Sequence, residues 1–347
     1  MKEAKITLGP KVEIVDSQVP SPEAGQVLIK VVVSGSNPKD WKIAEWMPHL
    51  TPLNTGDDIA GTIEKVGDGV TDFKAGDRVA AFHEMMTSNG SFAEYAIAPA
   101  HTTFHLPEKT SFEEGAAVPL AALTAAMGLY APGKLALPPP SAPAKQKIPL
   151  LVYGASSAVG SYALQLASLS NIHPLICVAG KAQKHVESLI DRSKGDTIID
   201  YRSGDDALVE GLKKALDGQK LEYAFDAVSE KGSYVNIAAV LDPQGKCTLV
   251  LPPNGDWNGT YKELPSSVAQ SQTNVGSVHD DQKELGQTYS KLFSKGLQDG
   301  SFRGHPQEVI PGGLGGVQTG LENLRDGKAS AIKYVFRIAE TEGLKSS

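Results

Sequence analysis

The chain has 347 residues, more than the roughly 100–200 residues of a usual single domain, so we expect two domains. A hydrophobic content of 41% with 35 glycines is typical of a compact α/β protein with many tight turns. The net charge of −7, without a run of lysine or arginine, argues against nucleic acid or an anionic membrane as a partner.

The sequence also bears on the cellular compartment. The first fifteen residues lack the apolar core of a signal peptide, and the longest apolar stretch, Gly115–Ala131, is too short for a membrane span. Two isolated cysteines, Cys177 and Cys247, favour a reducing compartment over a disulfide framework. We therefore expect a cytoplasmic protein.

The first part of the chain, to about residue 123, is rich in predicted strands. Gln26–Val33 is a strong β run between turn signals, and shorter runs follow at Ile59–Val66 and Arg78–Phe82. Glycine and proline interrupt the segment repeatedly, which is typical of a partly open β-barrel.

In the middle of the chain the pattern changes, and apolar runs typical of β-strands alternate with stretches typical of helices. The β runs are Pro149–Tyr153, Pro174–Val178, Thr197–Ile199, Tyr223–Val228 and Lys246–Leu251. Ser161–Leu169, between the first two, has helical periodicity. Strand, helix and strand at this spacing predict a Rossmann-type doubly wound parallel sheet.

Two further segments complete the expected organisation. The proline-rich segment 135–149 predicts an exposed loop before the first strand of the parallel sheet. From about Asp280 the chain returns to helix, then a glycine-rich turn at 311–316, a helix and a strand at Tyr334–Ile338. We expect a catalytic domain at 1–123, completed by 280–347, and a nucleotide-binding domain at 124–279.

A turn of small residues lies between the strand that begins at Leu150 and the following helix. Gly154 and Gly160 bracket the sequence Ala-Ser-Ser-Ala-Val. Small residues let a pyrophosphate approach the backbone, and the helix N-terminus offers unpaired N–H groups and a positive dipole end. Such turns also occur for packing reasons, but the strand–turn–helix–strand context favours a dinucleotide.

The end of the second strand indicates which dinucleotide. An NAD enzyme would place an acidic residue there to bind the ribose 2′-hydroxyl. This strand is instead followed by Gly180, Lys181 and Lys184, and the next carboxylate is Glu187. The two lysines suit a 2′-phosphate, and Tyr201 with Arg202 could close over it, so we predict NADPH. Solvated lysines at a helix start are the alternative interpretation.

Residues 56–79, GDDIAGTIEKVGDGVTDFKAGDRV, resemble the signature of the medium-chain dehydrogenase/reductase superfamily. Further similar segments are Asn37–Asp40, Ser91–Tyr95 and Pro119–Ala125, and the similarity covers essentially the whole chain. Within the superfamily the chain resembles the quinone oxidoreductase and enoyl reductase branch, and within it the fungal trans-acting enoyl reductases (ToxD-like). The resemblance implies a GroES-like catalytic domain beside a Rossmann domain.

Zinc-dependent alcohol dehydrogenases of this superfamily hold their catalytic ion with cysteines and a His-Glu pair. The equivalent positions here are near Asn37 and at Asp57 and Asp58, and no cysteine precedes Cys177. Two cysteines cannot supply a four-cysteine structural site. We therefore predict no metal.

Hydride delivery to an already polarised acceptor does not need a Lewis acid, whereas alcohol oxidation does. The resemblance places Asn37, Lys42 and Thr124 at the catalytic centre, where Lys42 could stabilise an enolate. Lys42 could equally be a solvated surface lysine.

The predicted contacts follow from the phosphate turn and the resemblance. The cofactor contacts are Asn37, Pro38, Asp40, Thr124, Gly154, Ser156, Ser157, Ala158, Val159, Gly160, Gly180, Lys181, Lys184, Tyr201, Val228, Val250, Leu251 and Ser330. The substrate contacts are Trp46, Leu120, Leu123, Gly313 and Leu314.

The leading functional hypothesis is an NADPH-dependent reductase of an enone, enoyl thioester or quinone. A non-catalytic NADPH-binding redox sensor or structural protein is one alternative, and a zinc-type alcohol dehydrogenase is another. We expect a small or carrier-bound unsaturated substrate and either a monomer or a homodimer.

Overall fold

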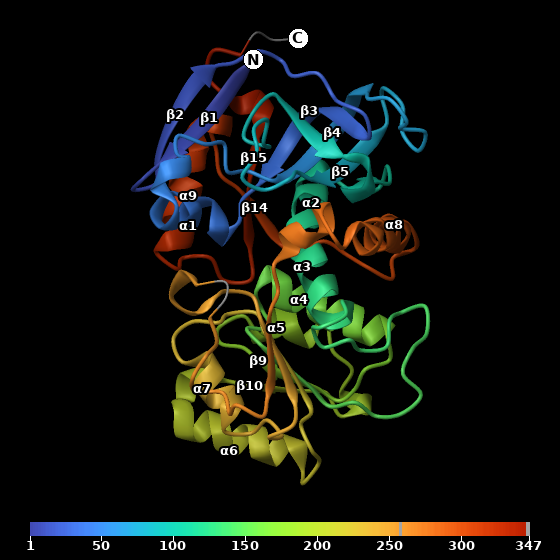
Figure 1. Ribbon diagram of the computed structural model, residues 1–347, viewed down its shortest axis with the longest axis vertical. Helices are drawn as coiled ribbons and strands as arrows, with labels where there is room; N and C mark the ends of the chain where they lie inside the picture. Colours follow the sequence, from blue (N-terminus) through green and yellow to red (C-terminus); the bar gives the residue numbers. More distant parts are fainter. Residues whose placement is uncertain (257–258, 345–347) are drawn as a thin grey trace. The chain divides into compact units, whose positions relative to one another are not determined.

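The computed structural model describes residues 1–256 and 259–344 (Figure 1). The chain forms two compact units: unit 1 comprises residues 1–120 and 276–347, and unit 2 comprises residues 121–275. The functional domain limits expected from the sequence, at 123/124 and 279/280, stay a prediction.

Unit 1 is built on a seven-stranded sheet with the order β14-β15-β3-β4-β5-β7, and β6 also pairs with β3. A separate hairpin, β1 and β2, pairs with the segments before β6 and β4 through isolated bridges from Glu3 to Ala93 and from Ile6 to Leu53. The strands are β1 (Lys2–Thr7), β2 (Lys11–Asp16), β3 (Gln26–Gly35), β4 (Asp58–Val66), β5 (Arg78–Phe82), β6 (Tyr95–Pro99), β7 (Thr103–His105), β14 (Gln307–Val309) and β15 (Lys333–Arg337). The helices are α1 (Pro38–Trp46), α2 (Phe112–Ala116), α8 (Lys283–Asp299) and α9 (Val317–Arg325).

The core of unit 1 forms where alternate residues of these strands face inward. Val27, Ile29 and Val31 of β3 pack with Ile59 of β4 and with Phe336 of β15. Period-two alternation of apolar residues therefore produces a sheet with one face buried, as the sequence predicts. Helix α3 (Pro119–Tyr130) begins in unit 1 and continues into unit 2.

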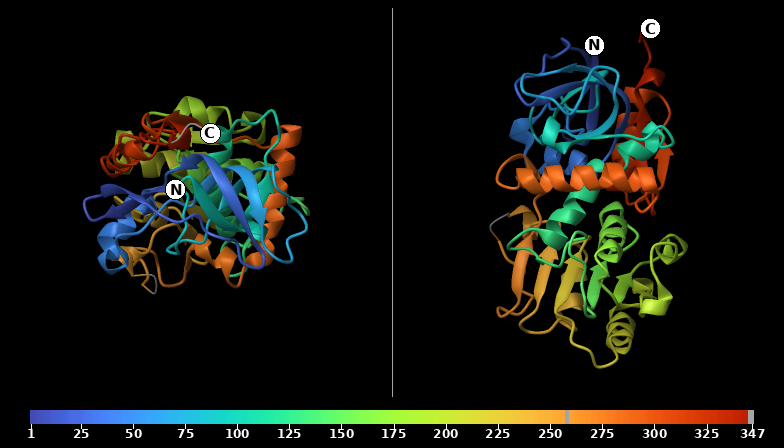
Figure 2. Two further views of the ribbon diagram at one scale, coloured as in Figure 1. Left: turned by 90° about the horizontal axis from the view of Figure 1, so that it is seen from above. Right: turned by 90° about the vertical axis from the view of Figure 1, so that its right-hand side faces the viewer.

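Unit 2 contains a six-stranded, all-parallel sheet with the order β10-β9-β8-β11-β12-β13 (Figure 2, right). The strands are β8 (Leu150–Tyr153), β9 (Leu175–Val178), β10 (Thr197–Ile199), β11 (Tyr223–Asp226), β12 (Lys246–Leu249) and β13 (Ala269–Gln272). The helices are α4 (Ala158–Leu169), α5 (Gln183–Glu187), α6 (Asp205–Leu216) and α7 (Ser233–Ala238). Strand order reverses beside β8, as in a doubly wound fold, so the predicted fold class is confirmed.

Two predicted strands end earlier than their apolar runs. The sequence predicts that β11 reaches Val228, but the side chain of Asp226 accepts hydrogen bonds from the N–H groups of Val228 and Ser229 and turns the chain. It predicts that β12 reaches Leu251, but β12 ends at Leu249, and the next N–H, of Val250, is shared between the Asp226 carbonyl at 3.2 Å and the Ser229 hydroxyl at 3.0 Å. Both runs therefore leave the sheet at its carboxyl edge.

Segment 135–149 lacks regular structure, as predicted, and most of its residues are exposed or half-buried, although three apolar side chains anchor it. Leu135, Leu137 and Ala144 are buried. The Ala144 N–H donates to the Ser170 carbonyl at 2.8 Å, which joins the segment to the end of α4. The prediction of an exposed loop therefore agrees with most of the segment, and a few apolar side chains and backbone hydrogen bonds attach it to the rest of the chain. Among the described residues, no helix has the length and apolarity needed to cross a membrane.

Candidate nucleotide site and catalytic turn

The phosphate turn requires glycine at both of its ends. Gly154 has φ of +75°, and a Cβ there would lie 2.4 Å from Cγ2 of Val228. A Cβ on Gly160 would lie 2.3 Å from the carbonyl oxygen of Gly154. Both contacts are closer than atoms can approach, so the turn and the first turn of α4 can pack this tightly only without side chains.

Helix α4 begins directly at the turn. Ser157 is its N-cap, and its hydroxyl oxygen accepts a hydrogen bond from the Gly160 N–H at 3.0 Å. Ser156, Ala158 and Val159 are half-buried. Helix N-termini carry unsatisfied N–H groups and a partial positive charge. The residues of this turn therefore fit a pyrophosphate.

The carboxyl edge of β11 and β12 is organised by groups that the sequence analysis missed. Asp226 accepts from the Val228 and Ser229 N–H groups at 3.0 and 2.8 Å, and from the Ser233 hydroxyl at 2.6 Å. The Tyr261 hydroxyl contacts the carbonyl oxygens of Ser229 and Leu251. Burial raises the pKa of Asp226 to about 6, although these donors oppose the shift. The predicted contacts Val228, Val250 and Leu251 are thus held along one edge.

The predicted 2′-phosphate region lies after β9. The ring of Tyr201 lies against Gly180, where a Cβ would come within 2.7 Å of the ring. Tyr201 is 50% exposed, so one face of the ring remains accessible. Lys181 is exposed and Lys184 is exposed on the same segment. A phosphate here would meet cationic side chains beside an aromatic surface.

An acidic side chain next to Tyr201 is already engaged. Asp200 accepts hydrogen bonds from the guanidinium and the backbone N–H of Arg202 and from the side chain of Gln183, and this pairing lowers the pKa of Asp200 to about 2. Its charge is therefore balanced by a guanidinium inside the loop. The sequence did not indicate this pairing, because it predicted Arg202 as a possible contact of the 2′-phosphate instead.

In unit 1 the predicted catalytic turn starts helix α1. Asn37 is the N-cap, and the Asp40 carboxylate accepts from the Asn37 N–H at 2.7 Å, forming a capping box. Lys42 is buried, and its ammonium lies 5.0 Å from the ring centre of Trp41 and 5.1 Å from that of Trp46. Two aromatic faces at this distance stabilise a cation. The solvated-lysine alternative does not fit this position.

A second lysine in the turn lies among buried carboxylates. Lys39 forms ion pairs with Asp40, at 3.0 Å, and with Asp57, and it donates to the Thr55 carbonyl. Burial raises the pKa of Asp40 to about 7 and that of Asp57 to about 6, and Lys39 opposes both shifts. Burial works against the Lys39 ammonium, yet the two carboxylates raise the pKa of Lys39 overall. One cation therefore balances two acidic groups.

The other predicted contacts differ in accessibility. Pro38, Trp46 and Ser330 are exposed. Leu120, Leu123 and Thr124 are buried in α3. Leu314 is fully buried in the core of unit 1, so a substrate could reach it only if this turn opened. All of these roles stay predictions.

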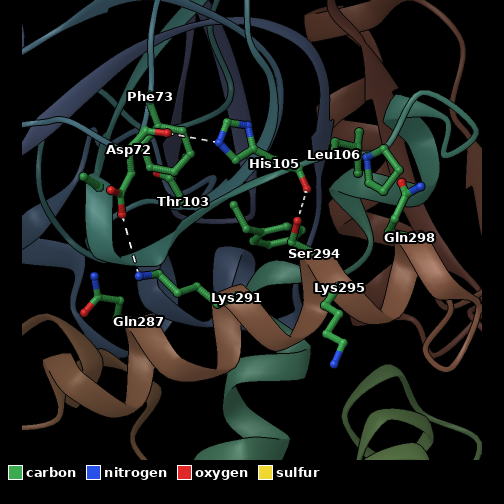
Figure 3. A pocket seen from close by; sticks show the side chains of 13 residues that line it. Asp72, Phe73, Thr103, His105, Leu106, Gln287, Lys291, Ser294, Lys295 and Gln298 are labelled. Atoms are coloured by element: carbon green, nitrogen blue, oxygen red, sulfur yellow. Dashed lines mark hydrogen bonds and ion pairs between the residues drawn. The ribbon is translucent and has the colours of Figure 1, made fainter.

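A groove of about 500 Å³ lies in unit 1 between β7 and one face of α8 (Figure 3). The rings of Phe73 and His105 contact each other in a tilted arrangement, Lys291 points toward Asp72, and Lys295 points away. None of the predicted catalytic or cofactor residues lines it. Among the described residues there is no cluster of three or more His, Cys, Asp or Glu suited to a metal ion. The expected absence of zinc stays a prediction.

Comparison with known proteins gives a family match at residues 23–108, described as an alcohol dehydrogenase GroES-like domain. A trans-enoyl reductase of Gibberella fujikuroi is 56% identical over 315 residues, 90% of this chain and 91% of its own length. A trans-enoyl reductase of Aspergillus sclerotiorum is 33% identical, with 93% and 96% covered. A chloroplast envelope quinone oxidoreductase homologue of Arabidopsis thaliana is also 33% identical, with 74% and 76% covered.

Solved structures share the fold at lower identity. A putative zinc-dependent alcohol dehydrogenase of Rhizobium etli superposes with a TM-score of 0.83 at 22% identity, covering 99% of both chains. A mycobacterial protein solved in complex with NADPH has a TM-score of 0.74 at 21% identity, covering 96% of this chain and 99% of its own. At these identities the likeness establishes the fold alone.

Proposed function

The chain belongs to the trans-enoyl reductase family of medium-chain dehydrogenases/reductases, and from this premise we propose that it is an NADPH-dependent reductase of an activated C=C bond. The acceptor is an enone, an enoyl thioester or a quinone. The observation that carries the proposal is the turn from Gly154 to Gly160, whose geometry fits a pyrophosphate, in a chain of this family.

Bound NADPH would supply the hydride. The residues that would hold it are the phosphate turn, the exposed lysines 181 and 184 beside Tyr201, and the β11–β12 edge at Val228 and Val250. What remains for the protein is to orient the acceptor, donate to its oxygen as negative charge develops there, and admit a proton.

Lys42 is the group we propose for that oxygen. Its ammonium is buried over two tryptophan rings, where removal from water strengthens its interaction with an enolate oxygen. Thr124, buried in α3, would donate its hydroxyl beside the acceptor. Both side chains would act by binding the acceptor and stabilising the negative charge on its oxygen, and neither role involves a metal ion.

The first test is NADPH oxidation with a panel of quinones, enones and enoyl thioesters. Turnover of at least one class supports the proposal. NADPH binding without turnover of any acceptor would favour the redox-sensor alternative. Stoichiometric zinc by elemental analysis would favour the alcohol dehydrogenase alternative.

Replacing Thr124 by alanine is expected to lower kcat about 100-fold, because one preorganised donor to a developing oxyanion contributes that much. NADPH affinity should change little. The matched control is Thr124→Ser, which keeps the hydroxyl and should retain most of the activity. Steady-state kinetics decide the point, and equal loss in both variants would contradict a role for the hydroxyl.

Replacing Lys181 and Lys184 together by glutamate is expected to raise KM for NADPH about 50-fold, because two charge-assisted contacts to the 2′-phosphate are lost. KM for NADH should change less than threefold. Lys194→Glu is the control, since this exposed lysine of unit 2 bonds Asn171 instead. An equal rise for both nucleotides would contradict recognition of the phosphate.

We also propose a cytoplasmic location, supported by two buried, unpaired thiols, Cys177 and Cys247. Whether the protein is a monomer or a homodimer stays open, and light scattering at micromolar concentration would distinguish them.

A further inference from the structure

Lys333 is a buried cation that the reaction described above does not use. It occupies the first position of β15 and is 4% exposed. Its ammonium donates to Oδ1 of Asn37 at 2.9 Å and to Oδ2 of Asp58. A charged side chain in this position needs such partners, because burial of an unpaired ammonium is costly.

Asp58 connects this cation to two other segments. Its Oδ2 also accepts from Nδ2 of Asn37 at 2.8 Å, so both ends of the Asn37 amide are bound within the protein. Its Oδ1 accepts from the Leu120 N–H at 2.7 Å. The Asn37 side chain therefore has a partner for its oxygen and for one of its two N–H donors.

The bond to Leu120 has the character of a helix cap. Helix α3 begins at Pro119, and Val118, which precedes it, has no side-chain oxygen to accept from the first turn. Asp58 does so from β4, and its negative charge also suits the positive end of the helix. The start of α3 is thus tied to a strand residue that lies 62 positions earlier in the chain.

Gly35 shows that the chain makes room for this arrangement. A Cβ on Gly35 would lie 3.1 Å from both Cε of Lys333 and Cβ of Asp58, and 2.2 Å from the Ala116 carbonyl oxygen. Strands β3, β4 and β15 and the end of α2 therefore meet at one point that only glycine permits.

We propose that Lys333 and Asp58 are positioning residues for the reduction: they hold the Asn37 turn and the first turn of α3, with Asn37 as the link between them. This inference rests on the proposed function. The turn leads into α1, which carries Lys42, and Leu120 precedes Thr124 by one turn of α3. In this assignment Asn37 orders the turn and does not donate to the substrate.

The test uses the full-length protein and four variants. Lys333→Met removes the charge, Lys333→Arg keeps it, and the double variant Lys333→Met/Asp58→Asn removes both charges so that neither remains buried alone. Lys328→Met, at an exposed lysine near the same strand, is the control. The measurements are kcat, KM, NADPH affinity, thermal unfolding, and amide hydrogen exchange of peptides that cover 37–42 and 119–124.

We expect Lys333→Met to lower kcat about 50-fold with NADPH affinity changed less than threefold, and Lys333→Arg to recover most of the loss. The double variant should be more thermally stable than Lys333→Met, because no charge remains buried alone. Its kcat should stay at least about tenfold below that of the parent protein, because the hydrogen bonds that hold the two segments are not restored. Exchange at 37–42 and 119–124 should be faster than in the parent protein in Lys333→Met and in the double variant.

A double variant with parental stability and kcat within twofold of the parent would overturn the proposal, as would parental exchange rates at both segments. If Lys333→Met does not fold, the thermal stability and kcat of the double variant decide whether the proposal holds. If the parent protein reduces no acceptor, the proposed function is wrong, and hydrogen exchange still shows whether the two segments are held by this network.

Discussion

Replacing Gly154 by alanine is expected to weaken NADPH binding about 1000-fold, because the displaced turn would lose at least two charge-assisted hydrogen bonds to phosphate. The added Cβ would lie 2.4 Å from Val228, and φ of +75° disfavours any side chain. The turn must therefore move away from Val228, and its N–H groups would move with it. Isothermal titration with NADPH measures the loss.

The control separates this effect from the cost of a strained backbone. Gly218, also in unit 2, has φ of +76°, and a Cβ at this position would have nothing within 4 Å. Gly218→Ala should cost about 1 kcal/mol of stability from the positive φ, with unchanged NADPH affinity. If both variants bind NADPH equally, packing of the turn is not what prepares the site.

Replacing Lys39 by methionine is expected to destabilise the protein by about 3–5 kcal/mol at pH 8, because removal of one partner leaves buried carboxylates without their cation. The loss should be much smaller at pH 5. Asp40 and Asp57 have pKa values raised to about 7 and about 6, so both are largely protonated at pH 5 in the folded protein.

The direction of this pH dependence follows from proton linkage. A carboxyl group whose folded pKa is raised contributes stability below its unfolded pKa near 4, and this contribution is lost as pH rises through 6 to 7. Without Lys39 the pKa values of Asp40 and Asp57 in the folded protein rise further. Ionisation of these two buried groups at pH 8 therefore lowers the free energy of unfolding by more than in the parent protein. Chemical unfolding at pH 5 and pH 8 tests this.

Lys291→Met is the matched control for the Lys39 variant. Lys291 lies in the same unit and is 66% exposed, at 3.7 Å from Asp72. Exposed pairs contribute roughly 0–1 kcal/mol, so little change is expected at either pH. Equal destabilisation of Lys39→Met at both pH values would show that the carboxyl pKa values are not coupled to this lysine.

The sequence alone determined the parallel sheet and the phosphate turn. Alternation of apolar residues and a run of small residues between Tyr153 and Ser161 are local patterns, and each strand or turn needs only its own few residues to be recognised. For the same reason it predicted NADPH from the missing acid after Val178, because that absence is visible in one short segment.

Only the tertiary structure decided how the buried charges pair. Asp58 and Lys333 lie 275 residues apart, and nothing in either segment indicates the other. The motif predicts Asn37 as a catalytic contact, and only the structure shows that its amide is bonded to these two side chains, so its catalytic role stays a prediction. Asp226 lies inside an apolar run of the sequence, although its carboxylate ends that strand. Hydrogen-bond partners are selected by proximity in space after the chain has folded, which local sequence patterns do not encode.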